Sequence, residues 1–101
     1  MRDRLYLIQT EFDDAQLPGR RFYCKDCITV EGLLAAFPDR AANLDVIRLP
    51  FPRPRREIVT LLGEENQNLP SLVLAEGGFV NEIEALLQAL HVRHGFPERH
   101  P

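Results

Sequence analysis

The chain has 101 residues, of which 45% are hydrophobic and 27% charged, a composition that fits one small globular domain and excludes a disordered segment. Lys and Arg total 12 against 15 Asp and Glu, for a net charge of -3. That balance gives no overall attraction to phosphate backbones or anionic lipids, so neither nucleic acid nor a membrane is an expected partner. We therefore expect a single domain over residues 1–101.

The N-terminal segment is predicted to be a strand and not a targeting signal. Residues 4–10 hold a short apolar run with Tyr and Ile, and Glu11, Asp13 and Asp14 follow at once. The run is too short for a signal peptide, and no stretch approaches the roughly 20 apolar residues of a membrane span. We expect a buried first strand in a cytoplasmic protein, a compartment that keeps neighbouring cysteines reduced. A long loop through Pro18 and Gly19 should follow.

The two cysteines of the chain, Cys24 and Cys27, form a C-x-x-C pair at the start of a predicted helix. Apolar residues recur at helical spacing over residues 25–37, and Pro38 ends the run. Cys24 then lies at the helix N-terminus and Cys27 in the first turn. A C-x-x-C pair also forms half of many zinc sites, but after a first strand and at a helix start it indicates a redox dithiol.

The next two predicted elements are a strand and a helix. Residues 43–49 alternate in the manner of a strand that Pro50 and Pro52 end. Residues 54–63 are predicted to form a helix with Gly63 at its C-cap position.

The last three predicted elements are two strands and a helix. Pro70 introduces a strand over residues 71–75, and Gly77 and Gly78 suit a hairpin turn into a short strand at 79–80. Asn81, with Glu84 three residues on, resembles the N-cap of a helix that ends at Gly95. A right-handed crossover and a final hairpin then give an α/β fold with a four-stranded mixed sheet flanked by three helices. The first helix begins at the sheet edge where open sheets present their sites.

Two segments carry a resemblance to a known superfamily. Residues 22–27 (Phe-Tyr-Cys-Lys-Asp-Cys) at a helix start, with Leu69-Pro70 before a strand some forty residues later, resemble the thioredoxin and glutaredoxin superfamily. More narrowly, the chain is similar along nearly its whole length to an uncharacterised thioredoxin-like family of bacterial proteins. The segments that resemble it are 21–34, 51–55, 63–70 and 94–98.

This resemblance implies a thioredoxin-like fold of order β-α-β-α-β-β-α and a site at its dithiol. Cys24 would be the attacking thiolate and Cys27 the resolving thiol. Leu69-Pro70 would form a cis peptide bond facing the dithiol, and the substrate surface would comprise Tyr23, Lys25, Leu69 and Pro70. The Gly77-Gly78 pair is predicted to turn the hairpin and not to hold glutathione, so no cofactor is expected.

Simple electrostatics supports the order of the two thiols. A helix N-terminus favours negative charge by about 0.3 to 1 kcal/mol and acts most strongly on Cys24. Lys25, with Arg20 and Arg21, would add to this effect, whereas the neighbouring Asp26 opposes it. The loop that precedes Tyr23 is long enough to cover part of the dithiol.

Three functions stay open at this point. The first is a thiol-disulfide oxidoreductase acting on a protein or small-molecule thiol or disulfide. The second is a binding or adaptor module that uses the surface around Pro70 with idle thiols, and the third is metal or cluster binding through Cys24 and Cys27. His91 and His94 have the composition of the other half of a zinc site. The predicted topology places them roughly 20 Å from the cysteines, so they are expected on the helix surface and no metal site is expected within one chain. A metal shared between two subunits stays open.

The remaining polar residues of interest lie in two loops. The basic patch is predicted to be solvated, with binding of an anionic substrate group as the alternative, and comprises Arg48, Arg53, Arg55 and Arg56. Residues 64–68 are predicted to be a surface loop, with a substrate role for Asn66 or Gln67 as the alternative. Phe96, in the C-terminal tail, is expected to pack on the domain.

Overall fold

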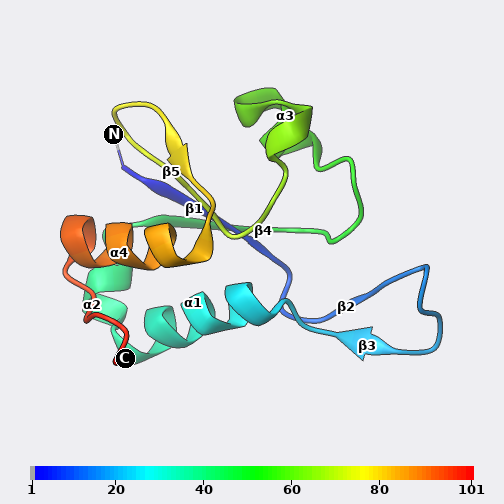
Figure 1. Ribbon diagram of the computed structural model, residues 1–101, viewed down its shortest axis with the longest axis horizontal. Coiled ribbons are helices and arrows are strands. Elements are labelled where there is room, and N and C mark those ends of the chain that lie inside the picture. The colour runs from blue at the N-terminus through cyan, green and yellow to red at the C-terminus, as the bar shows by residue number, and fades with distance from the viewer. Residues whose placement is uncertain (1) are drawn as a thin grey trace.

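The computed structural model describes residues 2–101 and contains one mixed sheet of four strands (Figure 1). The strand order is β4-β1-β5-β6. β1 pairs in parallel with β4 and antiparallel with β5, and β5 pairs antiparallel with β6. The strands are β1 (Arg4–Ile8), β4 (Asp45–Leu49), β5 (Ser71–Val73) and β6 (Phe79–Val80). The predicted α/β class and four-stranded mixed sheet are therefore confirmed.

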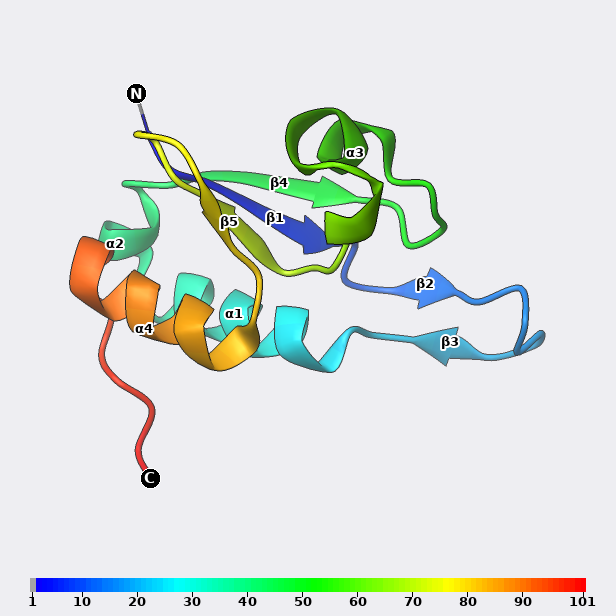
Figure 2. The same ribbon diagram turned by 45° about the horizontal axis from the view of Figure 1, so that its top comes forward.

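Helices cover both faces of this sheet (Figure 2). α1 (Lys25–Ala36) and α4 (Ile83–His94) lie side by side on one face, and α3 (Arg56–Leu62) lies on the other. The short helix α2 (Pro38–Ala41) follows α1. It begins at Pro38, since proline is tolerated in the first turn of a helix. A 3-10 turn, η1 (Glu64–Asn66), follows α3.

The central strand β1 is the core of the molecule. Leu5, Tyr6, Leu7 and Ile8 are all buried because helices cover both faces of the strand. This explains why its sequence shows a continuous apolar run in place of the alternation expected for a half-exposed strand. Helix residues from both sides complete the core, and the predicted packing of Phe96 is confirmed because that residue is fully buried.

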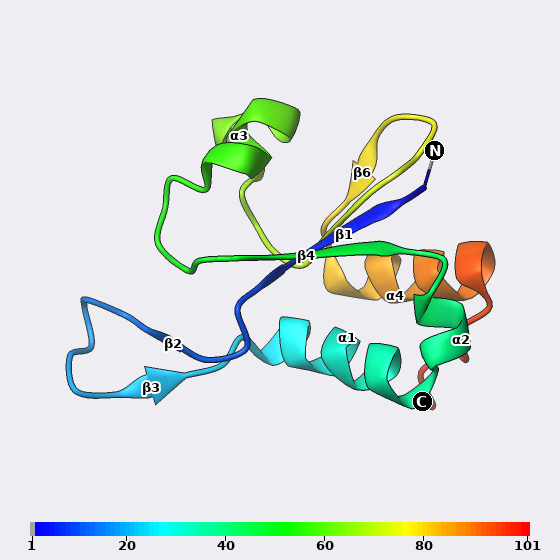
Figure 3. The same cartoon turned by 180° about the vertical axis from the view of Figure 1, so that it is seen from behind.

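The segment expected to be a loop before the cysteines is a β-hairpin. β2 (Phe12–Asp13) pairs antiparallel with β3 (Arg21–Phe22), with Phe12 opposite Phe22 and Asp13 opposite Arg21. Aromatic and opposite-charge pairs across two strands stabilise such pairing. In Figures 1 and 3 the hairpin extends away from the sheet and does not fold back over α1, so the expected covering loop is not observed.

Two helix starts differ from the sequence predictions. α3 begins at Arg56, two residues later than expected. α4 is capped by Glu82 and not by Asn81, because the Glu82 carboxylate accepts the backbone N–H groups of Glu84 and Ala85 at 2.9 and 3.1 Å. The predicted turn at Gly77 and Gly78 is confirmed, with φ values of 111° and 87° that favour glycine.

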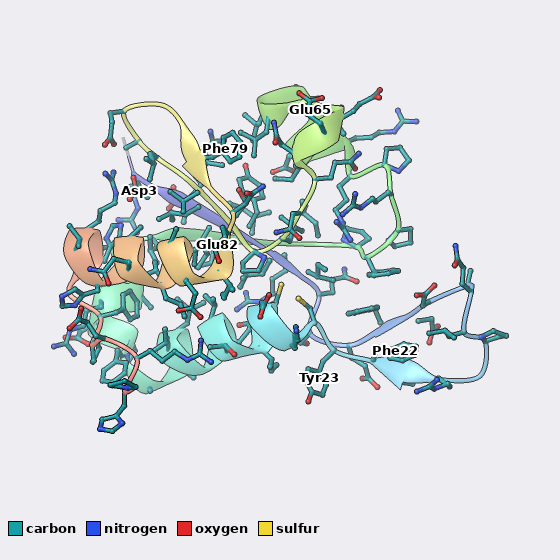
Figure 4. All side chains as sticks on the ribbon, viewed as in Figure 1. Asp3, Phe22, Tyr23, Glu65, Phe79 and Glu82 are labelled. Carbon is teal, nitrogen blue, oxygen red and sulfur yellow. The ribbon has the colours of Figure 1, made fainter. Side chains whose placement is uncertain are left out.

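A buried carboxylate joins the two ends of the chain. Asp3 precedes β1 and lies against the end of α4 (Figure 4), where it accepts hydrogen bonds from the Arg93 guanidinium at 2.7 and 2.8 Å. It also contacts His94 Nε2 at 2.7 Å and the Ala75 N–H at 2.8 Å. His94 was expected on the helix surface, but its side chain is only 12% exposed because it packs on Asp3. The Arg93 hydrogen bonds, above all, hold the pKa of Asp3 well below its usual range.

We predict that Asp3→Ala lowers the free energy of unfolding by about 3 kcal/mol at pH 7, since it leaves the groups around a buried carboxylate without their acceptor. Because the pKa of Asp3 is lower in the folded protein than in the unfolded chain, its ionised carboxylate stabilises the fold fully at pH values above the unfolded-state pKa of about 3.9. This stabilisation is lost as the pH falls further, so the difference between wild type and variant should shrink below about pH 4. Urea unfolding at pH 7 and pH 3 measures both effects.

The matched control is Asp45→Ala, which removes an exposed carboxylate paired with Arg2. Its expected cost is below about 1 kcal/mol, the usual range for surface ion pairs. Equal losses in the two variants would contradict a special role for Asp3.

Candidate functional site

Cys24 is the N-cap residue of α1. Its backbone is extended, with φ -79° and ψ 119°, and its Sγ atom accepts the backbone N–H of Cys27 at 3.2 Å. A sulfur atom therefore occupies the place that a Ser or Asp oxygen takes in most helix caps. The cap fixes Cys24 Sγ over the free amides of the first helical turn, where partial positive charge gathers.

Cys27 lies one turn further on and faces the core. It is 3% exposed, and the Ile8 N–H at the end of β1 points to its Sγ atom at 3.5 Å. Cys24, in contrast, is half-buried, and both thiols are free. Figure 4 shows the two sulfur atoms, in yellow, close together at the start of α1. The C-x-x-C pair thus has one accessible and one inaccessible thiol.

The two thiols differ sharply in acidity. The Cys27 thiol donates a hydrogen bond to the Cys24 sulfur, and this is the largest influence that lowers the pKa of Cys24, to about 6. Burial opposes the shift, the N–H groups of Cys27 and Asp26 assist it, and the Asp26 carboxylate opposes it. The same hydrogen bond, followed by burial, raises the pKa of Cys27 well above its ordinary range. At neutral pH the arrangement favours a Cys24 thiolate held by a protonated Cys27.

The residues beside Cys24 are exposed. Tyr23 is 64% exposed and points away from the sheet, and Lys25 is exposed at the first helical position. Arg21 was expected to support the thiolate, but its guanidinium bonds Glu11 and Asp13 across the β2–β3 hairpin. Arg20 lies over the Phe22 ring at 5.0 Å.

The Leu69–Pro70 peptide bond is cis, as the resemblance implied. Leu69 is 4% exposed, Pro70 is fully buried, and Leu69 belongs to the same core cluster as Cys27. These side chains therefore lie beneath the surface and do not form an exposed platform. A second cis peptide bond, Arg53–Pro54, was not foreseen from the sequence.

The four arginines of the predicted solvated basic patch lie in different environments in the structure. Arg53 and Arg56 are exposed, and Arg48 forms a two-point ion pair with Glu31 at 2.7 and 2.8 Å. Arg55 is buried with 6% exposure, and its guanidinium donates to the carbonyl oxygens of Phe51 and Gln67. The prediction that all four arginines are solvated is therefore wrong for Arg55. Alternation of arginine with proline carries no signal that one arginine faces inward.

The two polar residues considered for substrate binding have structural partners. Gln67 is 8% exposed, its Oε1 accepts the Arg55 N–H at 2.7 Å, and its Nε2 donates to the Glu64 carbonyl at 3.0 Å. Asn66 donates to the Leu62 carbonyl at 2.8 Å and so closes the end of α3. The prediction of a surface position is wrong for Gln67, because the buried Arg55 needs its oxygen atoms.

Within residues 2–101 the structure does not bring three or more His, Cys, Asp or Glu side chains together in a way that could hold a metal ion. None of the helices in this part of the chain is long and apolar enough to span a bilayer.

These observations define an α/β protein with an asymmetric C-x-x-C dithiol at the N-terminus of its first long helix. Residues 2–98 match the family described as Protein of unknown function (DUF3088), and the chain belongs to that family. No curated protein and no solved structure matches the sequence.

We predict that Cys27→Ala raises the pKa of Cys24 from about 6 toward the free-cysteine value of about 8.5, since it removes the hydrogen-bond donor that chiefly lowers it. Cys27→Ser should give a smaller rise, because its hydroxyl can still donate. The rate of alkylation of Cys24 against pH, read by mass, measures both values. If both variants titrated with the wild type, the hydrogen bond between the two thiols would not be the cause.

Proposed function

We propose that this protein is a thioredoxin-like thiol-disulfide oxidoreductase in which Cys24 attacks and Cys27 resolves. The observation that carries the proposal is the contrast between the two sulfur atoms. The accessible Cys24 has its pKa lowered to about 6, whereas the buried Cys27 has its pKa raised by its bond to Cys24. Such a contrast is what a dithiol needs to react in a fixed order.

The topology supports the thioredoxin-like part of the proposal. β1 lies inside the sheet, followed by a parallel partner, β4, and an antiparallel pair, β5 and β6. The dithiol begins the helix that connects β1 to β4, beyond the carboxyl end of β1, and open sheets carry their reactive groups at such edges. This supports the order of elements that the resemblance implies.

The proposed reaction has two exchange steps. The Cys24 thiolate attacks one sulfur of a substrate disulfide, forms a mixed disulfide with it and releases the other sulfur as a thiolate. Cys27 then loses its proton and attacks Cys24 Sγ, which forms the Cys24–Cys27 disulfide and releases the second substrate thiolate. Two electrons pass from the dithiol to the substrate, and an external dithiol reductant restores the reduced protein.

The structure explains how the buried Cys27 becomes reactive in the second step. Its pKa is raised first by the hydrogen bond to Cys24 and then by burial. Once Cys24 is part of a mixed disulfide it no longer carries negative charge, so the largest of these influences disappears. Cys27 is thus held protonated until Cys24 has reacted, which suits an ordered mechanism.

The proposed substrate is a protein or low-molecular-weight disulfide that meets the protein at the exposed side of Cys24. Tyr23 and Lys25 flank that side and would contact the substrate. Leu69 and Pro70 would support the site from beneath, as buried neighbours. We place the reaction in a reducing compartment such as the cytoplasm, where a dithiol reductant can restore Cys24 and Cys27.

We predict that the reduced wild type reacts with the disulfide reagent 5,5′-dithiobis-(2-nitrobenzoate) and releases about two equivalents of thiol per chain, with no adduct retained. Cys27→Ser should release about one equivalent and retain a mixed disulfide on Cys24. Cys24→Ser should react at least about tenfold more slowly, because the remaining thiol is buried and protonated. Absorbance and intact mass measure these outcomes, and equal rates for wild type and Cys24→Ser would contradict the proposed order.

Turnover separates an enzyme from a reactive but idle dithiol. With dithiothreitol as reductant and insulin as the disulfide substrate, the wild type should accelerate reduction and Cys24→Ser should not. A wild type that forms its disulfide but gives no turnover with protein or small-molecule disulfides would favour the adaptor function instead.

A further inference from the structure

An unexpected feature of the structure is the buried guanidinium of Arg55. The residue is 6% exposed, yet across the part of the chain that the structure describes it takes part in no salt bridge. Its Nη1 and Nη2 atoms donate to the carbonyl oxygens of Gln67 and Phe51 at 2.8 and 2.7 Å, and the guanidinium lies 5.6 Å from the centre of the Phe51 ring. Its Nε atom is buried without a hydrogen-bond partner.

Such a charge is costly to bury. A cation removed from water without an acidic partner loses several kcal/mol of hydration, which neutral carbonyl oxygens and an aromatic ring restore only in part. Guanidinium does not escape by losing its proton. The nearest acid along the chain, Glu57, is exposed and is not among the hydrogen-bond partners of the Arg55 guanidinium, and Arg53 only adds repulsion. A negative charge close to Arg55 would therefore be strongly favoured.

Two series of contacts connect the neighbours of Arg55 with the neighbours of the dithiol. Ile8, whose N–H contacts Cys27 Sγ, pairs with Leu49, and the chain then passes through Phe51 to Arg55. On the other side, Gln67 bonds both the backbone and the guanidinium of Arg55, and Leu69 of the Cys27 core cluster follows two residues later. The ring of Phe51 also stacks on Phe12 of the β2–β3 hairpin at 4.5 Å, on the side from which the chain enters Cys24.

The charges themselves support the same pairing. Burial and Arg53 lower the pKa of Arg55, and the influence that raises it is negative charge on the dithiol of Cys27 and Cys24. The other charged groups around the dithiol are Asp26, which opposes a Cys24 thiolate, and the exposed Lys25. Arg55 is thus the buried cation available to the ionised dithiol.

We propose that Arg55 is the electrostatic partner of the dithiol, a positioning residue whose buried charge favours the reduced, ionised Cys24–Cys27 pair over the disulfide. When the dithiol is oxidised, the negative charge is lost and Arg55 again lacks a partner. The protein disulfide therefore takes electrons more readily from a thiol such as glutathione, giving one oxidised glutathione for every two reduced molecules consumed. This inference rests on the dithiol being the reacting centre proposed above.

The test compares Arg55→Gln with Arg55→Lys, since both side chains can donate to a carbonyl but only lysine carries charge. Arg55→Gln should raise the pKa of Cys24 by about 0.5 to 1 unit, measured by iodoacetamide alkylation against pH. It should also move the equilibrium with glutathione toward the protein disulfide by about three- to tenfold. Arg55→Lys should stay close to the wild type in both measurements although both variants lose thermal stability.

Arg56→Gln is the matched control, because it removes the same charge from the next, exposed residue. If Arg56→Gln raised the Cys24 pKa as much as Arg55→Gln does, the effect would come from net charge and the proposal would be overturned. A folded Arg55→Gln with an unchanged Cys24 pKa would also overturn it. Alkylation by iodoacetate, an anionic reagent, provides a further comparison with neutral iodoacetamide. If Arg55→Gln slowed the alkylation of Cys24 by iodoacetate alone, Arg55 would be a site for an anionic substrate group, and the proposal would be overturned.

Should Arg55→Gln not fold, the wild type still tests the proposal through salt. One molar KCl screens exposed charges but acts little on buried pairs. A Cys24 pKa that stays within about 0.2 units is the result expected for a buried partner, whereas a larger rise assigns the effect to the exposed Lys25 and overturns the proposal. These alkylation measurements need no turnover, so an Arg55 effect in a protein that reduces no disulfide would refute the proposed function and leave this inference standing.

Discussion

The complete burial of β1 is the constraint on which the rest of the structure depends. Because helices cover both of its faces, the register of β1 with β4 is fixed by apolar side chains on each side. That register places the end of β4 beside Ile8, whose N–H contacts the buried sulfur of Cys27. The same pairing thus anchors the buried thiol of Cys27 and determines where the loop that carries Arg55 begins.

The properties of the dithiol follow from a helix cap that uses sulfur. A Ser or Asp at position 24 would satisfy the same amide, but it would offer no nucleophile for disulfide exchange. With Cys24 as the cap, the hydrogen bond that begins α1 also stabilises a thiolate, and Cys27 is directed into the core one turn later. Helix formation and thiol activation therefore depend on the same atoms, and a change at either residue affects both.

Much of this arrangement can be predicted from local sequence signals. The apolar run of β1, the helical spacing after Cys24 and the glycines at 77 and 78 each specify an element through short-range rules, and these elements are observed. The β2–β3 hairpin was missed because its strands are two residues long and its stabilising pairs, Phe12 with Phe22 and Asp13 with Arg21, span a turn of several residues. The Glu82 cap was missed because a longer side chain replaces the usual Asn or Ser.

The positions that could not be predicted are those whose partners lie far along the chain. Asp3 finds Arg93 and His94 about ninety residues away, and Arg55 finds Gln67 across a helix and a turn. Local patterns treat every arginine of the 48–56 segment alike, yet folding buries one and leaves three exposed. Arg55 holds two loops together through its carbonyl bonds, and a neutral donor at this position could also form such bonds. Because neutral carbonyl oxygens offset the cost of a buried cation only in part, we propose that the charge of Arg55 serves the chemistry of Cys24.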